Sequence, residues 1–200
     1  MIARWICVGL TAAFLAMFMV ASGADDTSAG ESKTAIFAGG CFWCVEDAFD
    51  NVDGVSETVS GYAGGTLPEP TYGRHEGHVE ALKVTYDPSK VTYAQLLDHY
   101  WHNIDPFDAT GQFCDKGPAY RTVVFTSDEE ERTLAEKTKK DISTRFNKTV
   151  ATEVRPTTTF TAAEEYHQDY HNKNPVSYKY YKWGCGRAQR LSEIWGSKGS

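Results

Sequence analysis

The feature that most constrains the fold of this chain is the stretch Gly39-Gly40-Cys41-Phe42-Trp43-Cys44. The run before it, Ala35–Ala38, is short and apolar, which favours a strand, and two successive glycines suit a tight turn. After it, Val45 and Phe49 recur at helical spacing. The sequence therefore predicts a strand, a turn and a helix that begins beside Cys41.

Cys41 is predicted to lie on the first turn of that helix. Unpaired backbone N–H groups and the positive end of the helix dipole favour an anion there. A thiol in that position loses its proton more easily, and the thiolate is the nucleophile. We therefore expect Cys41 to have a lowered pKa and to act as a reactive nucleophile.

The same residues, Cys41-Phe42-Trp43-Cys44, form a C-x-x-C motif. In an exported protein this motif is typical of a disulfide oxidoreductase of the thioredoxin-like kind. A buried structural cysteine pair is a further interpretation of the same spacing. The motif alone leaves these interpretations open.

The first 24 residues match a secretory signal peptide. Arg4 precedes an apolar run at 5–20, and small residues follow at 21–24. We predict cleavage near Gly23 or Ala24 and export, in a bacterium to the periplasm; an uncleaved membrane anchor is the alternative. Residues 25–33 are small and polar and are expected to form a flexible leader, with one catalytic domain at 34–200.

Charge and cysteine content narrow the functional classes. Loss of Arg4 with the signal peptide changes the net charge from −7 to about −8, which argues against a nucleic-acid partner. Cys7 would also be removed, and the mature chain keeps Cys41, Cys44, Cys114 and Cys185. Four cysteines are few for a disulfide scaffold of this size, so we expect redox chemistry.

The hydrophobic pattern alternates between strand and helix periods. Strands are expected at 35–38, 55–62, 79–86, 120–126 and 150–154, and helices from 41 onward and at 92–104, 127–146 and 162–172. Ser127 and Glu130 predict a capping box for the third helix. The loops at 64–78 and 105–119 and the tail are expected to be long and irregular. This order indicates a single-domain α+β fold, an α/β plait with a ferredoxin-like sheet and helices packed on it.

Glu80 is the strongest candidate for an acid. The alternation of Glu80, Leu82 and Val84 places its carboxyl on an otherwise apolar strand face. Burial would raise its pKa, so that it could stay protonated and donate a proton near neutral pH. The alternative is a solvated glutamate at the end of the strand.

Histidines give little support for a metal site. His75 and His78 with Cys114, or His167 and His171 at i, i+4, could be considered as ligands. No H-E-x-x-H motif or second C-x-x-C accompanies them. We therefore expect no metal.

Taken together, these motifs resemble the peptide methionine sulfoxide reductase A family. The similarity runs in order over residues 34–175 or so. It is carried by Gly40–Trp43, Ser60–Gly65, Pro70–Tyr72, Gly77–Glu80, Tyr86–Pro88, Asp105–Pro106, Tyr120–Arg121 and His167–Tyr170.

The resemblance implies an α/β plait that reduces the S-epimer of methionine sulfoxide, free or in proteins. It implies Cys41 as nucleophile and Glu80 as acid, with Tyr72, Asp115 and Tyr120 lining the site. Phe42 and Trp43 would hold the substrate methyl. The products would be methionine and a sulfenic acid on Cys41. No cofactor is implied: reducing equivalents would come from a thioredoxin-like protein, or from dithiothreitol in vitro, and we expect a monomer.

Two departures from the family pattern concern the cysteine that resolves the sulfenic acid. Many members have glycine where Cys44 stands, and a Gly-Tyr-Cys where this chain has Ser177-Tyr178-Lys179. Cys185, between two glycines in a tail expected to be mobile, is our preferred resolving residue, with Cys44 and Cys114 as alternatives. A thioredoxin-like oxidoreductase and a non-catalytic peptide-binding module remain the competing functions.

Overall fold

The computed structural model describes residues 1–2 and 31–196. The predicted signal peptide, apart from its first two residues, and nearly all of the leader therefore lie outside the described residues. Within the described part of the chain, no helix combines the length and the apolar character needed to cross a membrane.

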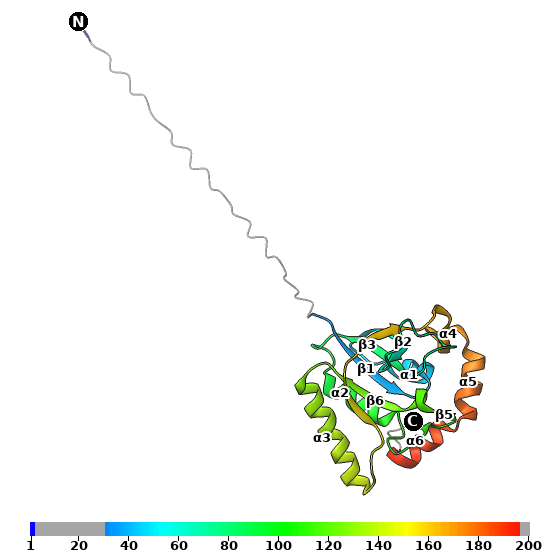
Figure 1. Ribbon diagram of the computed structural model, residues 1–200. Helices are drawn as coiled ribbons and strands as arrows, with labels where there is room; N and C mark the ends of the chain where they lie inside the picture. Colours follow the sequence, from blue (N-terminus) through cyan, green and yellow to red (C-terminus); the bar gives the residue numbers. More distant parts are fainter. Residues whose placement is uncertain (3–30, 197–200) are drawn as a thin grey trace.

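One mixed sheet organises the molecule (Figure 1). Its strand order is β7-β6-β1-β3-β2-β8. The strands are β1 (Lys33–Gly39), β2 (Val55–Ala63), β3 (Val79–Tyr86), β6 (Thr122–Thr126), β7 (Glu153–Pro156) and β8 (Phe160–Ala162). All neighbouring pairs run antiparallel except β6 and β7, which are parallel. A separate small hairpin joins β4 (Gly111–Gln112) to β5 (Asp115–Lys116).

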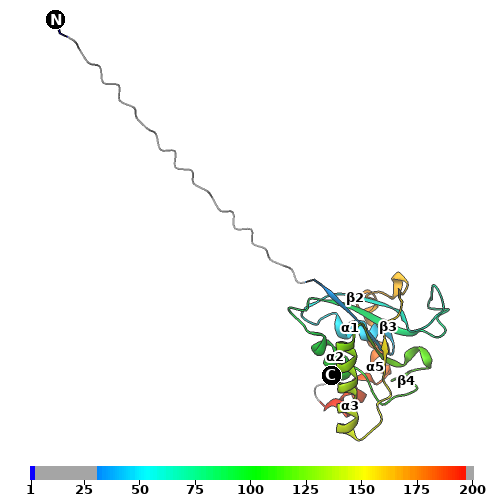
Figure 2. The ribbon, with the colours of Figure 1, turned by 60° about the vertical axis from the view of Figure 1, so that its left-hand side comes forward.

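Helices surround this sheet. They are α1 (Phe42–Phe49), α2 (Tyr93–His102), α3 (Glu129–Phe146), α4 (Tyr170–Lys173), α5 (Pro175–Gly184) and α6 (Arg187–Trp195), with short 3₁₀ turns at Pro118–Tyr120 and Glu165–His167. Figure 2 shows α2 and α3 together on one side of the sheet. The predicted α+β class, with helices packed on a sheet, is confirmed.

The central strand β1 is buried on both faces. Successive side chains of a strand point to opposite faces, so Phe37 joins the large core beneath the helices while Ile36 and Ala38 join a second cluster. In the large core, Phe37 stacks on Tyr100 of α2 with ring centroids 5.0 Å apart, and the Tyr100 hydroxyl donates to the carbonyl of Ala38. This packing fixes the strand end from which the Gly39-Gly40 turn leads to Cys41.

The third helix begins one or two residues later than the sequence predicted. Asp128, rather than Ser127, is the N-cap of α3, and its carboxylate accepts from the Glu131 amide at 2.8 Å. Glu131 in turn accepts from the Ser127 amide at 2.7 Å. Aspartate caps as well as serine does, so the reciprocal contact forms with the acid that lies three residues after Asp128.

The helix predicted at 162–172 is wrong. This segment instead contains the end of β8, a 3₁₀ turn and the short α4. The Gln168 side chain donates to the carbonyl of Ser60 and accepts from its amide, both at 2.9 Å. Asp169 then adopts a left-handed conformation, with φ 53°. These long-range bonds and the backbone reversal interrupt the helical path.

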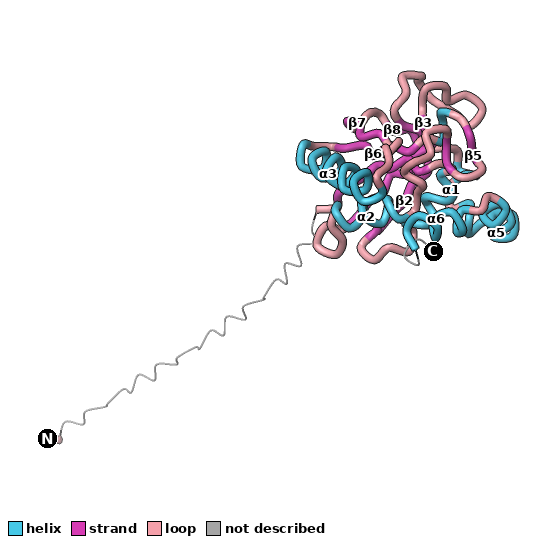
Figure 3. The backbone as a smooth tube through the Cα atoms, turned by 90° about the horizontal axis from the view of Figure 1, so that it is seen from below, coloured by secondary structure: helices cyan, strands magenta, loops and turns pink. Residues whose placement is uncertain are grey.

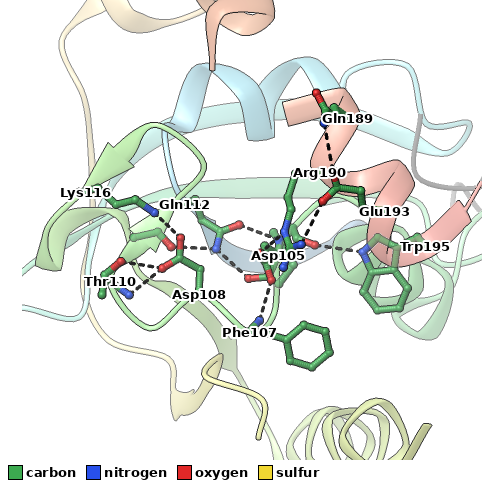
Figure 4. A network of polar contacts seen from close by, with 12 residues as sticks. Asp105, Phe107, Asp108, Thr110, Gln112, Lys116, Gln189, Arg190, Glu193 and Trp195 are labelled. Carbon is green, nitrogen blue, oxygen red and sulfur yellow. Dashed lines mark hydrogen bonds and ion pairs between the residues drawn. The ribbon is translucent and has the colours of Figure 1, made fainter. Parts of the chain in front are cut away.

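The tail is not irregular, contrary to expectation, because α5 and α6 are docked by polar contacts. Figure 4 shows the contacts of α6: Arg190 donates to Asp105 at 2.7 Å, and the Trp195 indole donates to the Ile104 carbonyl at 3.0 Å. The Gln112 amide in turn binds the backbone of Asp105. The tail is thereby fixed to the loop that precedes the β4–β5 hairpin.

Candidate active site

Cys41 stands at the N-cap of α1, at the helix start that the sequence predicted. Its carbonyl accepts from the amides of Cys44 and Val45 at 3.0 and 3.3 Å. Gly40 before it has φ +85°, and a Cβ there would lie 2.5 Å from that of Gln112. Glycine is therefore required in this turn, which holds Cys41 against the loop containing Gln112.

Glu80 lies directly beside the reactive cysteine. Its carboxyl oxygen Oε2 accepts from the Phe42 amide at 2.9 Å, and the residue is 2% exposed. Burial raises the pKa of Glu80 to about 8, and the negative charges of Asp115 and Cys44 add to that effect against the Phe42 hydrogen bond. The carboxyl is thus mainly protonated at neutral pH, and the alternative of a solvated strand-end glutamate is wrong.

The thiols of Cys41 and Cys44 form a buried pair, with exposed fractions of 7% and 4%. Burial raises the pKa of Cys41, and its hydrogen bond to Cys44 and the nearby charge of Cys44 raise it further. That hydrogen bond lowers the pKa of Cys44 to about 6, with support from the positive charge of Arg187. The lowered pKa predicted for Cys41 is therefore wrong in this state, because desolvation outweighs the helix start and the pair holds its negative charge on Cys44.

Tyr72 and Tyr120 approach the same position from two loops. Tyr72 lies between β2 and β3, Tyr120 ends the 3₁₀ turn after β5, and the Tyr120 hydroxyl hydrogen-bonds that of Tyr72. Burial raises the pKa of both phenols, and the charges of Glu80 and Cys41 act in the same direction. Both hydroxyls therefore stay protonated and available as donors.

Asp115 completes the predicted set from strand β5. Burial raises the pKa of its carboxyl, and a hydrogen bond from Tyr181 opposes that shift. The Tyr181 hydroxyl lies 2.5 Å from Asp115 Oδ2 and is also within hydrogen-bond reach of the Cys41 sulfur. Cys41, Glu80, Tyr72, Tyr120 and Asp115 thus form one cluster.

Sequence reasoning missed Tyr181 and its neighbour Tyr178, both on α5. The Tyr178 hydroxyl donates to Asp47 at 2.8 Å and contributes to the low pKa of Cys44. Lys182 donates to the same Asp47 carboxylate at 2.6 Å. A signal was present: Tyr178, Tyr181 and Cys185 recur at i, i+3 and i+7, the spacing of one helix face.

Phe42 and Trp43 form an aromatic wall at the start of α1. Phe42 lies 5.1 Å from the His167 ring, and the Trp43 indole donates to His167 Nδ1 at 3.2 Å. Trp43 also stacks on Tyr170, with centroids 3.8 Å apart. Both predicted substrate-binding aromatics therefore lie next to Cys41 in fixed orientations.

The histidines considered as metal ligands have other contacts. His78 lies between the Gly65 amide and the Leu67 carbonyl, and His171 Nε2 is 3.2 Å from Asp50. Within residues 31–196, a compact set of possible ligands occurs at Cys114, Asp115 and Cys185. The two sulfurs of that set are joined to each other, which removes them as thiolate ligands.

A disulfide connects Cys114 to Cys185 across 71 residues, with Cα atoms 4.8 Å apart. Cys114 is exposed in the β4–β5 hairpin, and Cys185 is the C-cap of α5. Cys185 is therefore held at an ordered helix end rather than in a mobile tail. The bond lies next to the site, because Asp115 follows Cys114 and Tyr181 lies one turn before Cys185.

Comparisons with known proteins agree with this arrangement. A sequence model of the family described as peptide methionine sulfoxide reductase matches residues 33–199. The chain is 45% identical over 186 residues to the peptide methionine sulfoxide reductase MsrA 2 of Caulobacter vibrioides, covering 90% of this chain and 94% of that protein. The structure of methionine sulfoxide reductase A of Corynebacterium diphtheriae matches with a TM-score of 0.65 and 30% identity, over 72% of this chain and 76% of that one. Mxr1 from Saccharomyces cerevisiae, in its complex with Trx2, shares the fold at a TM-score of 0.50 and 23% identity, over 70% of this chain and 84% of that one.

Proposed function

The chain belongs to the peptide methionine sulfoxide reductase family, and from that premise we propose how its own side chains reduce methionine sulfoxide. The observation that carries the proposal is the buried cluster of a thiol, a protonated carboxyl and two phenols around Cys41. The family membership replaces the competing interpretations of a thioredoxin-like disulfide oxidoreductase and a non-catalytic binding module.

In the first step, the Cys44 thiolate accepts the proton of Cys41, and the Cys41 sulfur attacks the sulfoxide sulfur. Glu80 donates its proton to the sulfoxide oxygen while Tyr72 and Tyr120 donate hydrogen bonds to it. The S–O bond to methionine breaks, and the oxygen stays on Cys41. The products are methionine and a Cys41 sulfenic acid.

Cys44 is the first thiol available to resolve that sulfenic acid. It already hydrogen-bonds Cys41, whereas Cys185 is bonded to Cys114. Attack of Cys44 on the sulfenic sulfur forms a Cys41–Cys44 disulfide and releases water. When Cys114 and Cys185 are reduced, they can take over this oxidation: the two active-site thiols are regenerated, and a Cys114–Cys185 disulfide forms.

This order predicts where the disulfide appears after one turnover. Reduced mature protein, treated with one equivalent of substrate and no reductant, should contain Cys114–Cys185 with Cys41 and Cys44 free. The double variant Cys114→Ser, Cys185→Ser should instead accumulate Cys41–Cys44. Peptide mapping by mass spectrometry distinguishes these bonds, and a Cys41–Cys185 bridge in the parent protein would contradict Cys44 as the first resolving residue.

The aromatic wall predicts the epimer that is consumed. A site with Phe42 and Trp43 on one side of the sulfur and the donors Glu80, Tyr72 and Tyr120 on the other accepts one arrangement of methyl, oxygen and chain. We expect turnover of the S-sulfoxide and none of the R-sulfoxide. Chiral chromatography of a racemic mixture measures this, and equal consumption of both epimers would contradict the proposed pocket.

The reductant in the cell is proposed to be a thioredoxin-like protein. The solved complex of Mxr1 with Trx2 concerns the yeast protein, and it supports a protein partner here as well. Export to the periplasm rests on the N-terminal sequence, Arg4 and the apolar run at 5–20. Cell fractionation with mass measurement of the mature protein tests it; a full-length chain in the membrane fraction would favour the anchor instead.

A further inference from the structure

The outer face of α5 carries an apolar stripe that the rest of the described chain leaves open. Val176, Tyr180 and Trp183 are 81%, 75% and 79% exposed. Their spacing of i, i+4 and i+7 puts them on one face of the helix. Figures 1 and 3 show α5 at the periphery of the molecule, on the side away from α3.

This exposure is unusual because the opposite face of α5 is also apolar. Tyr178 is buried there, and Tyr181 reaches Asp115 and Cys41. A helix that is apolar on both faces is normally covered on both. Exposed aromatic residues in a contiguous patch mark interaction sites more often than they occur by chance.

The stripe leads to the disulfide that an external reductant must reach. Trp183 lies two residues before Cys185, and the bonded Cys114 is exposed. Cys41 and Cys44, in contrast, are buried. A protein dithiol attacks one sulfur of a disulfide directly, so its surface must rest against residues around that bond.

We propose that Val176, Tyr180 and Trp183 form the docking surface for the dithiol protein that reduces Cys114–Cys185. One partner thiolate attacks a sulfur of this bond and forms a mixed disulfide. The second partner thiol then breaks the mixed disulfide, so that the partner leaves oxidised. Two electrons and two protons end on Cys114 and Cys185. This inference rests on the proposed function, for which it supplies the last step.

The size of the stripe fits such a transient partner. Stable interfaces bury about 800 Å² on each side, whereas weak redox encounters lie at the low end of interface size. Three side chains match the second class better than a second copy of this chain. An aromatic pair such as Tyr180 and Trp183, with ring centroids 6.3 Å apart, is typical of the residues that dominate binding energy.

Kinetics with two reductants test this surface. Methionine sulfoxide reduction is measured with dithiothreitol, and separately with increasing thioredoxin regenerated by NADPH and thioredoxin reductase. Trp183→Ala and Tyr180→Ala should raise the KM for thioredoxin by about tenfold or more, because truncated aromatic anchors typically cost that much affinity. Tyr180→Phe and Trp183→Phe keep a ring and should stay close to the parent. The rate with dithiothreitol should be unchanged in all four variants, which also shows that they fold.

The outcomes separate this inference from the function beneath it. No turnover by the parent with dithiothreitol would overturn the proposed function. Normal turnover with an unchanged KM for thioredoxin in both alanine variants would overturn the docking surface alone. The same holds if Trp183→Ala dissociates a dimer seen by sedimentation, or if it raises the KM for an oxidised protein substrate in dithiothreitol. Those two results would assign the stripe to a second copy or to the substrate.

Discussion

Replacement of Cys41 by serine is expected to abolish methionine sulfoxide reduction, even with an excess of dithiothreitol. A serine hydroxyl is not ionised near neutral pH and cannot take the sulfoxide oxygen as sulfur does. Serine is also a favourable N-cap residue, so the start of α1 should persist. The loss of activity would therefore report on the nucleophile rather than on the fold.

Chromatographic measurement of methionine, with far-UV circular dichroism to check the fold, is the test. Cys44→Ser is the matched control, because it removes the other thiol of the buried pair. Dithiothreitol can reduce the Cys41 sulfenic acid directly, so this control should be slowed but still turn over. Substantial turnover by Cys41→Ser would remove Cys41 from the mechanism.

Local patterns in the sequence were sufficient for much of the framework of the site. The alternation around Glu80 predicted strand β3 with its observed bounds and the burial of that carboxyl. The glycine turn predicted a helix start at Cys41. Thr92 was correctly expected to cap the next helix, where it forms a capping box with Gln95. In each case the information lies within a few residues, where periodicity and turn chemistry operate.

The sequence could not supply features that arise from contacts across the chain. The raised pKa of Cys41 depends on burial, to which α5 contributes more than 130 residues later through Tyr181. The Cys114–Cys185 pairing spans two loops with no shared pattern, so spacing could not select it. The break at Asp169 follows a bond from Gln168 to Ser60, 108 residues away. Such contacts override local propensity and are invisible to a window of ten or twenty residues.

The pKa of Glu80 gives the mechanism a characteristic pH dependence. Its folded pKa of about 8 lies above the ordinary value of 4.5, so the acid form is present below about pH 8 and is lost above it. Only the acid form can donate a proton to the sulfoxide oxygen. The first-turnover rate of the parent protein should therefore fall as the pH rises through about 8.

Glu80→Gln is expected to slow the first turnover by roughly 10²–10⁴-fold, the usual contribution of a positioned proton donor. The amide has nearly the same volume as the carboxyl, and its carbonyl oxygen can still accept from Phe42, so the loop and helix start should remain in place. It cannot give up a proton, however, and the decline of rate above about pH 8 should disappear together with the rate. Rapid-quench single-turnover kinetics from acid to alkaline pH measure both effects, with Tyr72→Phe as the control that removes a hydrogen-bond donor but leaves the acid. A variant whose rate stays within about threefold of the parent, or which keeps the same alkaline decline, would show that the proton comes from another group.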